Sequence, residues 1–194
     1  GLFAVADGMG GYAGGAEASR ALVEIMAKYF LRMEEIRKRR EGGDETATIE
    51  NEAELLRRSI REANARIVIK RGEMPDEFHN MGTTCVSARV TRDVKGNAFG
   101  IIAHAGDSRA YLHHPDGRLE TLTLDDHLVL LTIKKTHGEE EALRIQEIFD
   151  NSVRREQTEM QLKDDPCIQP WMIAYYYKHH SQVSGAVGFK PDVK

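Results

Sequence analysis

The chain has 194 residues, with 27 basic and 31 acidic side chains and a net charge of −4. This length predicts one domain with an ordinary hydrophobic core, and the 41% of apolar residues excludes a disordered chain. The mild negative charge argues against a nucleic-acid binder, and the lack of a long apolar run argues against a membrane span. The two cysteines, Cys85 and Cys167, match no metal-binding spacing, which favours a reducing, cytoplasmic location.

The first half of the sequence predicts one strand and two helices. Residues 2–6 form a short apolar run typical of a buried strand. The glycine-rich stretch 7–15 predicts a loop, because each glycine costs about 1 kcal/mol inside a helix. Apolar side chains at three- and four-residue steps then predict amphipathic helices over residues 18–40 and 49–70.

A basic run closes the first predicted helix. It comprises Arg37, Lys38, Arg39 and Arg40, and it would suit a nucleic acid or an acidic partner. Cations in a last helical turn also interact favourably with the negative end of the helix dipole. We expect these side chains to face water.

The second half of the sequence predicts strands first and helices afterwards. β-Forming runs separated by turn residues predict an antiparallel meander over residues 83–90, 98–105, 109–113 and 119–124. A helical stretch follows and breaks near Gly138, the aromatic segment 171–177 fits either a helix or a strand, and residues 184–194 predict a short strand and turn. This order of elements predicts helices layered on antiparallel sheets.

Asp7 stands where the first predicted strand ends, beside glycine-rich backbone. A carboxylate held at such a position suits a hard cation such as Mg²⁺ or Mn²⁺, which binds carboxylate, carbonyl and water oxygens. Glycines would let the backbone approach that cation without a Cβ in the way. The same residues also suit an Asx-turn in which Asp7 caps its own loop, and both interpretations stay open.

The glycines also allow a third interpretation, a dinucleotide-binding loop, which is the main alternative to the cation site. Residues 8–13 (GMGGYA) match the pattern G-x-G-x-x-G/A after a strand and before a helix. A nucleotide-binding oxidoreductase domain would need a second parallel strand after that helix. The sequence instead predicts another helix there, so the required strand–helix–strand unit is missing.

Five segments carry a resemblance to one family, in that family's order. They are Leu2–Ser19 (LFAVADGMGGYAGGAEAS), Met81–Cys85 (MGTTC), His104–Leu112 (HAGDSRAYL), Leu122–His127 (LTLDDH), and Val183–Gly188 with Pro191–Val193. Together they resemble bacterial metal-dependent serine/threonine protein phosphatases of type 2C. One such motif would be weak evidence for the family, whereas five motifs in the family's order are specific evidence for it.

The resemblance implies an α+β fold in which two antiparallel β-sheets pack as a sandwich flanked by helix pairs. Residues 1–194 would form a single, incomplete domain with a variable helical flap at about 128–182 beside the active site. The implied activity is hydrolysis of phosphoserine and phosphothreonine on proteins with two Mn²⁺ or Mg²⁺ ions. The implied partners are phosphorylated proteins and a serine/threonine kinase, with no nucleic acid and no membrane.

The resemblance also assigns roles to individual residues. Asp7 would be the catalytic carboxylate that bridges the two metal ions, and the carbonyl of Gly8 would bind one of them. Asp107 would help to hold a third, weaker ion. The remaining residues of these motifs would be structural, namely Ser108, Arg109, Asp126 and His127.

The chemistry of such a site sets a limit on this chain. A metal pair lowers the pKa of a bound water from about 15.7 toward about 7, so no side-chain nucleophile is needed. Two dications about 3.5–4 Å apart repel by roughly 18 kcal/mol at an effective dielectric of about 20, and one carboxylate offsets little of that charge. The family's Asn-Glu-Asp, Ser-Asp-Gly and final Asp-Asn segments, which carry further acids, are absent from this sequence.

We therefore expect a fragment of an active phosphatase that by itself binds metal weakly and turns over little substrate. One alternative stays open beside it. A non-catalytic relative, acting as a binding or regulatory module, would keep the sandwich and lack the metal-binding acids in the missing segments.

Overall fold

The computed structural model describes residues 1–194 except for 75–77, 79, 152–154 and 180–194. The expected strand and turn over residues 184–194 therefore lie outside the described residues. Contacts divide the described chain after Ala110 into two compact units, and each unit is considered by itself.

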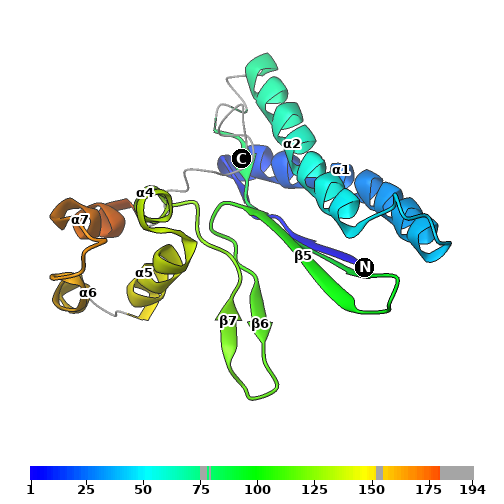
Figure 1. Ribbon diagram of the computed structural model, residues 1–194. Helices are drawn as coiled ribbons and strands as arrows, with labels where there is room; N and C mark the ends of the chain where they lie inside the picture. The colour runs from blue at the N-terminus through cyan, green and yellow to red at the C-terminus, as the bar shows by residue number, and fades with distance from the viewer. Residues whose placement is uncertain (75–77, 79, 152–154, 180–194) are drawn as a thin grey trace. The chain divides into compact units, whose positions relative to one another are not determined.

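The first unit is built on a three-stranded antiparallel sheet in the order β1-β4-β5 (Figure 1). In its register Val5 lies opposite Val86, and Cys85 lies opposite Ala105. The end of β1, the start of β4 and the end of β5 therefore lie at one edge of the sheet. A second, two-stranded antiparallel sheet pairs β2 with β3. These strands are β1 (Leu2–Val5), β2 (Gly8–Met9), β3 (Gly82–Thr83), β4 (Cys85–Arg92) and β5 (Ala98–Ala105).

Helix α1 (Gly11–Glu41) begins inside the glycine-rich stretch that the sequence predicts to be a loop. The prediction is wrong there, because the glycines serve close packing. A Cβ on Gly8 would lie 2.1 Å from the carbonyl oxygen of Gly15, so the first turns of α1 pack directly on β2. Gly10 precedes the helix with a φ of 103°, a left-handed conformation that favours glycine. This packing outweighs the low helix propensity of glycine.

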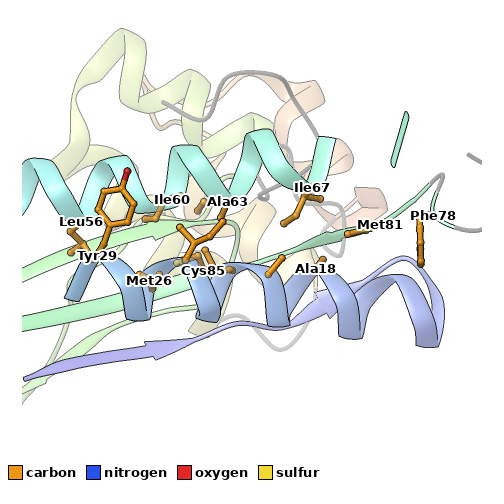
Figure 2. Close-up of a cluster of buried hydrophobic side chains, with 14 of the residues drawn as sticks. Ala18, Met26, Tyr29, Leu56, Ile60, Ala63, Ile67, Phe78, Met81 and Cys85 are labelled. Atoms are coloured by element: carbon orange, nitrogen blue, oxygen red, sulfur yellow. The ribbon is translucent and has the colours of Figure 1, made fainter. Parts of the chain in front are cut away.

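Helix α2 (Ile49–Glu73) pairs with α1, and together they cover one face of the three-stranded sheet. Thr48 starts α2 with a reciprocal capping box to Asn51, which satisfies amide groups that the first turn leaves unpaired. Figure 2 shows side chains of both helices directed toward one another and toward Cys85. The side chains at the centre of this cluster are fully buried; they include Leu22, Met33, Leu56, Ala63 and Ile67.

A buried ion cluster joins the two helices to β4. The Glu52 carboxylate accepts hydrogen bonds from Arg89 Nε at 2.6 Å and from Arg40 Nη2 at 2.5 Å. Arg40 Nη2 also donates to Thr91 Oγ1 at 2.8 Å. Arg40 is only 5% exposed, so the expectation that the whole basic run faces water is wrong for this residue.

The second unit begins with a hairpin of β6 (Tyr111–His113) and β7 (Leu119–Thr121). Within the described strands β6 pairs with β7 and not with β5, so the predicted meander is divided into two hairpins. Among the described residues of this unit four helices follow, and the break expected near Gly138 separates the first two. They are α4 (Leu128–His137), α5 (Glu139–Asn151), α6 (Arg155–Leu162) and α7 (Pro170–His179).

An aromatic cluster holds the helices of the second unit together. Tyr176 of α7 stacks on Phe149 of α5 with ring centroids 3.7 Å apart, which shows that the aromatic segment is a helix with a packing role. His127 caps α4, because its Nδ1 accepts the Val129 amide at 3.3 Å. This contact agrees with the structural role that the resemblance implies for His127.

The α+β class predicted from the sequence is confirmed by antiparallel sheets packed with helices. The nucleotide-binding oxidoreductase alternative fails, because α1 is followed directly by α2 and the described sheets are antiparallel. Among the described residues, no helix combines the length and the apolar character that crossing a membrane would require.

Candidate metal centre

The main chain at Asp7 is fixed by two threonines of the β3–β4 segment. The Asp7 amide donates to Thr84 Oγ1 at 3.1 Å, and the Thr84 amide donates to the Asp7 carbonyl at 2.9 Å. The Thr83 hydroxyl shares its one proton between the same carbonyl at 3.1 Å and the Thr84 carbonyl at 2.9 Å. Asp7 itself is exposed. Its carboxylate is thus carried by a rigid backbone and is open to a ligand.

Gly8 follows Asp7 directly and lies opposite Thr83 in the β2–β3 pair. Its close approach to Gly15 leaves no space for a side chain. Any larger residue would push α1 away from β2 and shift the adjacent backbone of Asp7. The glycine is thus required by helix packing, whatever its carbonyl binds.

Asp107 reaches the same sheet edge from β5. It is exposed and lies between Gly106 and Ser108, both of which contact Thr84. Ser108 Oγ lies 2.6 Å from Thr84 Oγ1. Gly106 has a φ of 103°, and a Cβ there would lie 3.0 Å from Thr84 Cγ2. The structure therefore brings the turns that carry Asp7 and Asp107 together at Thr84.

These donors fit part of the shell of a hard cation. Two exposed carboxylates at one sheet edge, with a glycine carbonyl beside one of them, are the oxygen ligands that Mg²⁺ and Mn²⁺ prefer. Within the described residues, neither Asp7 nor Asp107 belongs to a close group of three ligating side chains. A metal pair here would need further oxygen ligands.

A group of three potential ligands does occur in the second unit, at Glu141, Asp165 and Cys167. Arg144 occupies it, with ion pairs to both carboxylates. Hydrogen bonding to Arg144 lowers the pKa of Glu141. Burial opposes ionisation of Asp165, but the hydrogen bonds from Arg144 and from the Cys167 amide, together with the Arg144 charge, lower its pKa overall. Burial raises the pKa of the Cys167 thiol. This is a salt-bridge cluster in which two carboxylates share the single positive charge of Arg144.

The sequence did not reveal the role of Thr83 and Thr84. The resemblance includes their motif, but a pair of hydroxyls after a glycine does not disclose what they bind. Their partners lie more than 70 positions earlier in the chain. The signal present in the sequence was the co-occurrence of this motif with the Asp7 and Asp107 motifs.

With this geometry established, comparison with known proteins defines the class. The family described as Protein phosphatase 2C matches residues 1–154. The chain belongs to the protein phosphatase 2C family.

Two curated relatives are serine/threonine phosphatases. The protein phosphatase PstP of Mycobacterium tuberculosis is 35% identical over 128 residues, which are 66% of this chain and 21% of PstP. The phosphatase stp of Listeria welshimeri is 33% identical in an alignment 128 residues long, which covers 64% of this chain and 43% of that protein. The chain thus spans less than half the length of these relatives.

Solved structures share the fold. The crystal structure of the M. tuberculosis phosphatase PstP/Ppp superimposes with a TM-score of 0.50 at 26% identity, covering 98% of this chain and 60% of that one. PppA, a regulatory component of T6SS in Pseudomonas aeruginosa, superimposes with a TM-score of 0.56 at 20% identity, covering 100% of this chain and 57% of that one. The latter likeness supports the fold alone.

Proposed function

We propose that the protein hydrolyses phosphoserine and phosphothreonine on other proteins with a Mn²⁺ or Mg²⁺ pair. The observation that carries the proposal is the exposed Asp7 carboxylate on a backbone clamped by Thr83 and Thr84, in a chain of the protein phosphatase 2C family. The relatives named serine/threonine phosphatases support the same reaction.

In this proposal Asp7 would bind both ions, the Gly8 carbonyl would bind one, and Asp107 would help to hold a third, weaker ion. The bound metal would supply a water of lowered pKa and neutralise charge on the phosphoryl oxygens. The chain's own contribution is positional. Thr83 and Thr84 hold the Asp7 main chain, and Gly8 keeps α1 packed against it.

The first prediction concerns Asp7. In the full-length protein, Asp7→Asn should lower Mn²⁺-dependent dephosphorylation of a phosphothreonine peptide by about 100-fold or more. Loss of a residue that only orients a metal ligand already costs about 10–100-fold, so loss of a bridging ligand should cost at least as much. Phosphate release at saturating substrate measures the effect.

Asp93→Asn is the matched control, because Asp93 is a carboxylate in the β4–β5 turn at the opposite end of the sheet. Its activity should equal that of the unaltered protein. Equal activity of Asp7→Asn and Asp93→Asn would contradict the assigned role. A folded full-length protein without any Mn²⁺-dependent turnover would instead support the non-catalytic binding module.

We also propose that the helical flap at about 128–182 contributes to substrate choice. Its described helices, α4 to α7, pack around their own hydrophobic cluster, so this segment can vary without changing the sheet that carries Asp7. Phosphorylated proteins as substrates, a serine/threonine kinase as partner and a cytoplasmic location belong to the same proposal.

A further inference from the structure

One hydroxyl group, that of Thr84, connects the two turns that carry exposed carboxylates. Thr84 Oγ1 accepts the Asp7 amide at 3.1 Å and lies 2.6 Å from Ser108 Oγ. Thr84 is only 1% exposed, so water does not compete for these contacts. We infer that Thr84 is a positioning residue that fixes Asp7 and Asp107 relative to one another for metal binding. This inference rests on the proposed function.

The hydrogen-bonding capacity of the hydroxyl explains why it serves both turns. A threonine hydroxyl has one donor and two acceptor sites. One acceptor site takes the Asp7 amide, and the contact with Ser108 uses the proton or the second acceptor site. Removing the hydroxyl would leave the Asp7 amide without its acceptor and Ser108 without this partner, and an unpaired polar group in a buried place is costly.

The methyl group of Thr84 has a separate role. It faces Gly106, where a Cβ would lie 3.0 Å from Thr84 Cγ2. The methyl therefore sets how closely the β5 turn approaches, while the hydroxyl carries the hydrogen bonds. Thr84→Ser keeps the hydroxyl and loses the methyl, whereas Thr84→Val keeps the shape and loses the hydroxyl. The two variants separate hydrogen bonding from packing.

Amide hydrogen exchange in the metal-free, full-length protein tests the positioning directly. In Thr84→Val the Asp7 amide should exchange about tenfold faster, as expected when a hydrogen bond of typical strength is lost. In Thr84→Ser it should exchange within about twofold of the unaltered protein. Unchanged protection of the Asp7 amide in Thr84→Val would overturn the inference, and this outcome does not depend on any phosphatase activity.

Ser87→Ala is the matched control for loss of a buried hydroxyl in the same strand. Ser87 is 2% exposed, and its Oγ donates to the Ala103 carbonyl at 2.9 Å, away from the Asp7 turn. This variant should lose comparable stability and leave exchange at Asp7 unchanged. An equal increase at Asp7 in Ser87→Ala would assign the effect to general loosening and would overturn the specific role of Thr84.

Calorimetric titration with Mn²⁺ links the positioning to the metal. Thr84→Val should bind Mn²⁺ about 10–100-fold more weakly, the range typical of residues that orient metal ligands, with Thr84→Ser restoring affinity. Unchanged Mn²⁺ affinity despite faster exchange at Asp7 would overturn the link to metal binding. If the unaltered protein binds Mn²⁺ but hydrolyses no phosphoester, the proposed reaction fails while the positioning role stands.

Discussion

At the scale of single residues, burial decides the chemistry of Cys85. This residue opens β4 and is fully buried against the helix pair, and burial raises the pKa of its thiol to about 12, with the Ser87 hydroxyl opposing the shift slightly. The thiol is therefore neutral and unreactive in the folded protein. This agrees with the absence of Cys85 from every proposed catalytic role.

The raised pKa of Cys85 predicts a pH dependence of stability. A group whose pKa is higher in the folded state stabilises the fold below its unfolded pKa, near 9, and this stability is lost as the pH rises toward 12. Between pH 7 and pH 10 this residue should lower the free energy of unfolding by roughly 1–2 kcal/mol. Urea denaturation of the unaltered chain and of Cys85→Ala at both pH values measures this change in the free energy of unfolding. A pH dependence that is the same in both proteins would contradict the assignment.

Residues differ in how far the sequence reveals their role. Asp7 could be singled out, because an acid at the end of an apolar run and before glycines has few explanations. Thr84 could not, because its importance lies in contacts with Asp7 and Ser108, which are 77 and 24 positions away. A motif identifies the residue type, and only the fold identifies its partners.

At the scale of elements, the buried ion cluster attaches the helix pair to the sheet. Glu52 of α2 is fully buried and pairs with Arg40 of α1 and Arg89 of β4. The sequence placed Arg40 in a solvated basic run, because helical position alone predicts exposure. Its partners come from two other elements, so periodicity within α1 could not have revealed the burial.

The cluster gives a prediction at this scale. Glu52→Gln keeps the side-chain shape and leaves the Arg40 guanidinium without its buried counter-charge, whereas Arg89 keeps only the partly exposed Glu34 at 2.8 Å. Breaking a buried pair in this way costs about 3–5 kcal/mol, so the midpoint of urea unfolding should fall strongly. Glu54→Gln is the control, because Glu54 lies on the same helix in partly exposed pairs with Arg57 and Arg58. Its loss should shift the unfolding midpoint far less than Glu52→Gln does, because ion pairs in contact with water contribute little. Similar small losses in both variants would refute the role of the cluster.

The glycine-rich stretch shows why a local rule failed. Its composition predicts a loop, yet α1 starts at Gly11 because Gly8 and Gly15 must pack backbone against backbone. Helix propensity describes an isolated helix, and here a tertiary contact outweighs it. The same contact explains why the residue after Asp7 is a glycine, whether or not a cation binds there.

At the scale of the whole molecule, the order of the elements was sufficient to predict the class. One strand, two helices and then a series of strands predicted helices on antiparallel sheets, and the described chain has this arrangement. The division into two compact units could not be predicted, because both halves have ordinary composition and no linker separates them. Each unit has its own buried cluster.

This division makes the flap proposal testable. Replacing residues 128–182 with the corresponding segment of a homologue should change the ranking of phosphopeptide substrates by kcat/KM. Mn²⁺ affinity should stay the same, because Asp7 and Asp107 lie in the other unit. The measurement compares a phosphopeptide panel between the parent proteins and the exchange variant. An unchanged ranking with unchanged metal affinity would remove the flap from substrate choice.

The clamp on Asp7 also has a consequence for the kinetics of folding. The Thr84–Asp7 hydrogen bonds join positions that are 77 residues apart, with both α1 and α2 in the intervening chain. Helices form from local contacts, whereas a closure of this length must first overcome the entropy of a long loop. During refolding we therefore expect helical structure to appear before the protein can hold a cation. A nascent or partly folded chain would then contain every residue of the clamp and still lack the site.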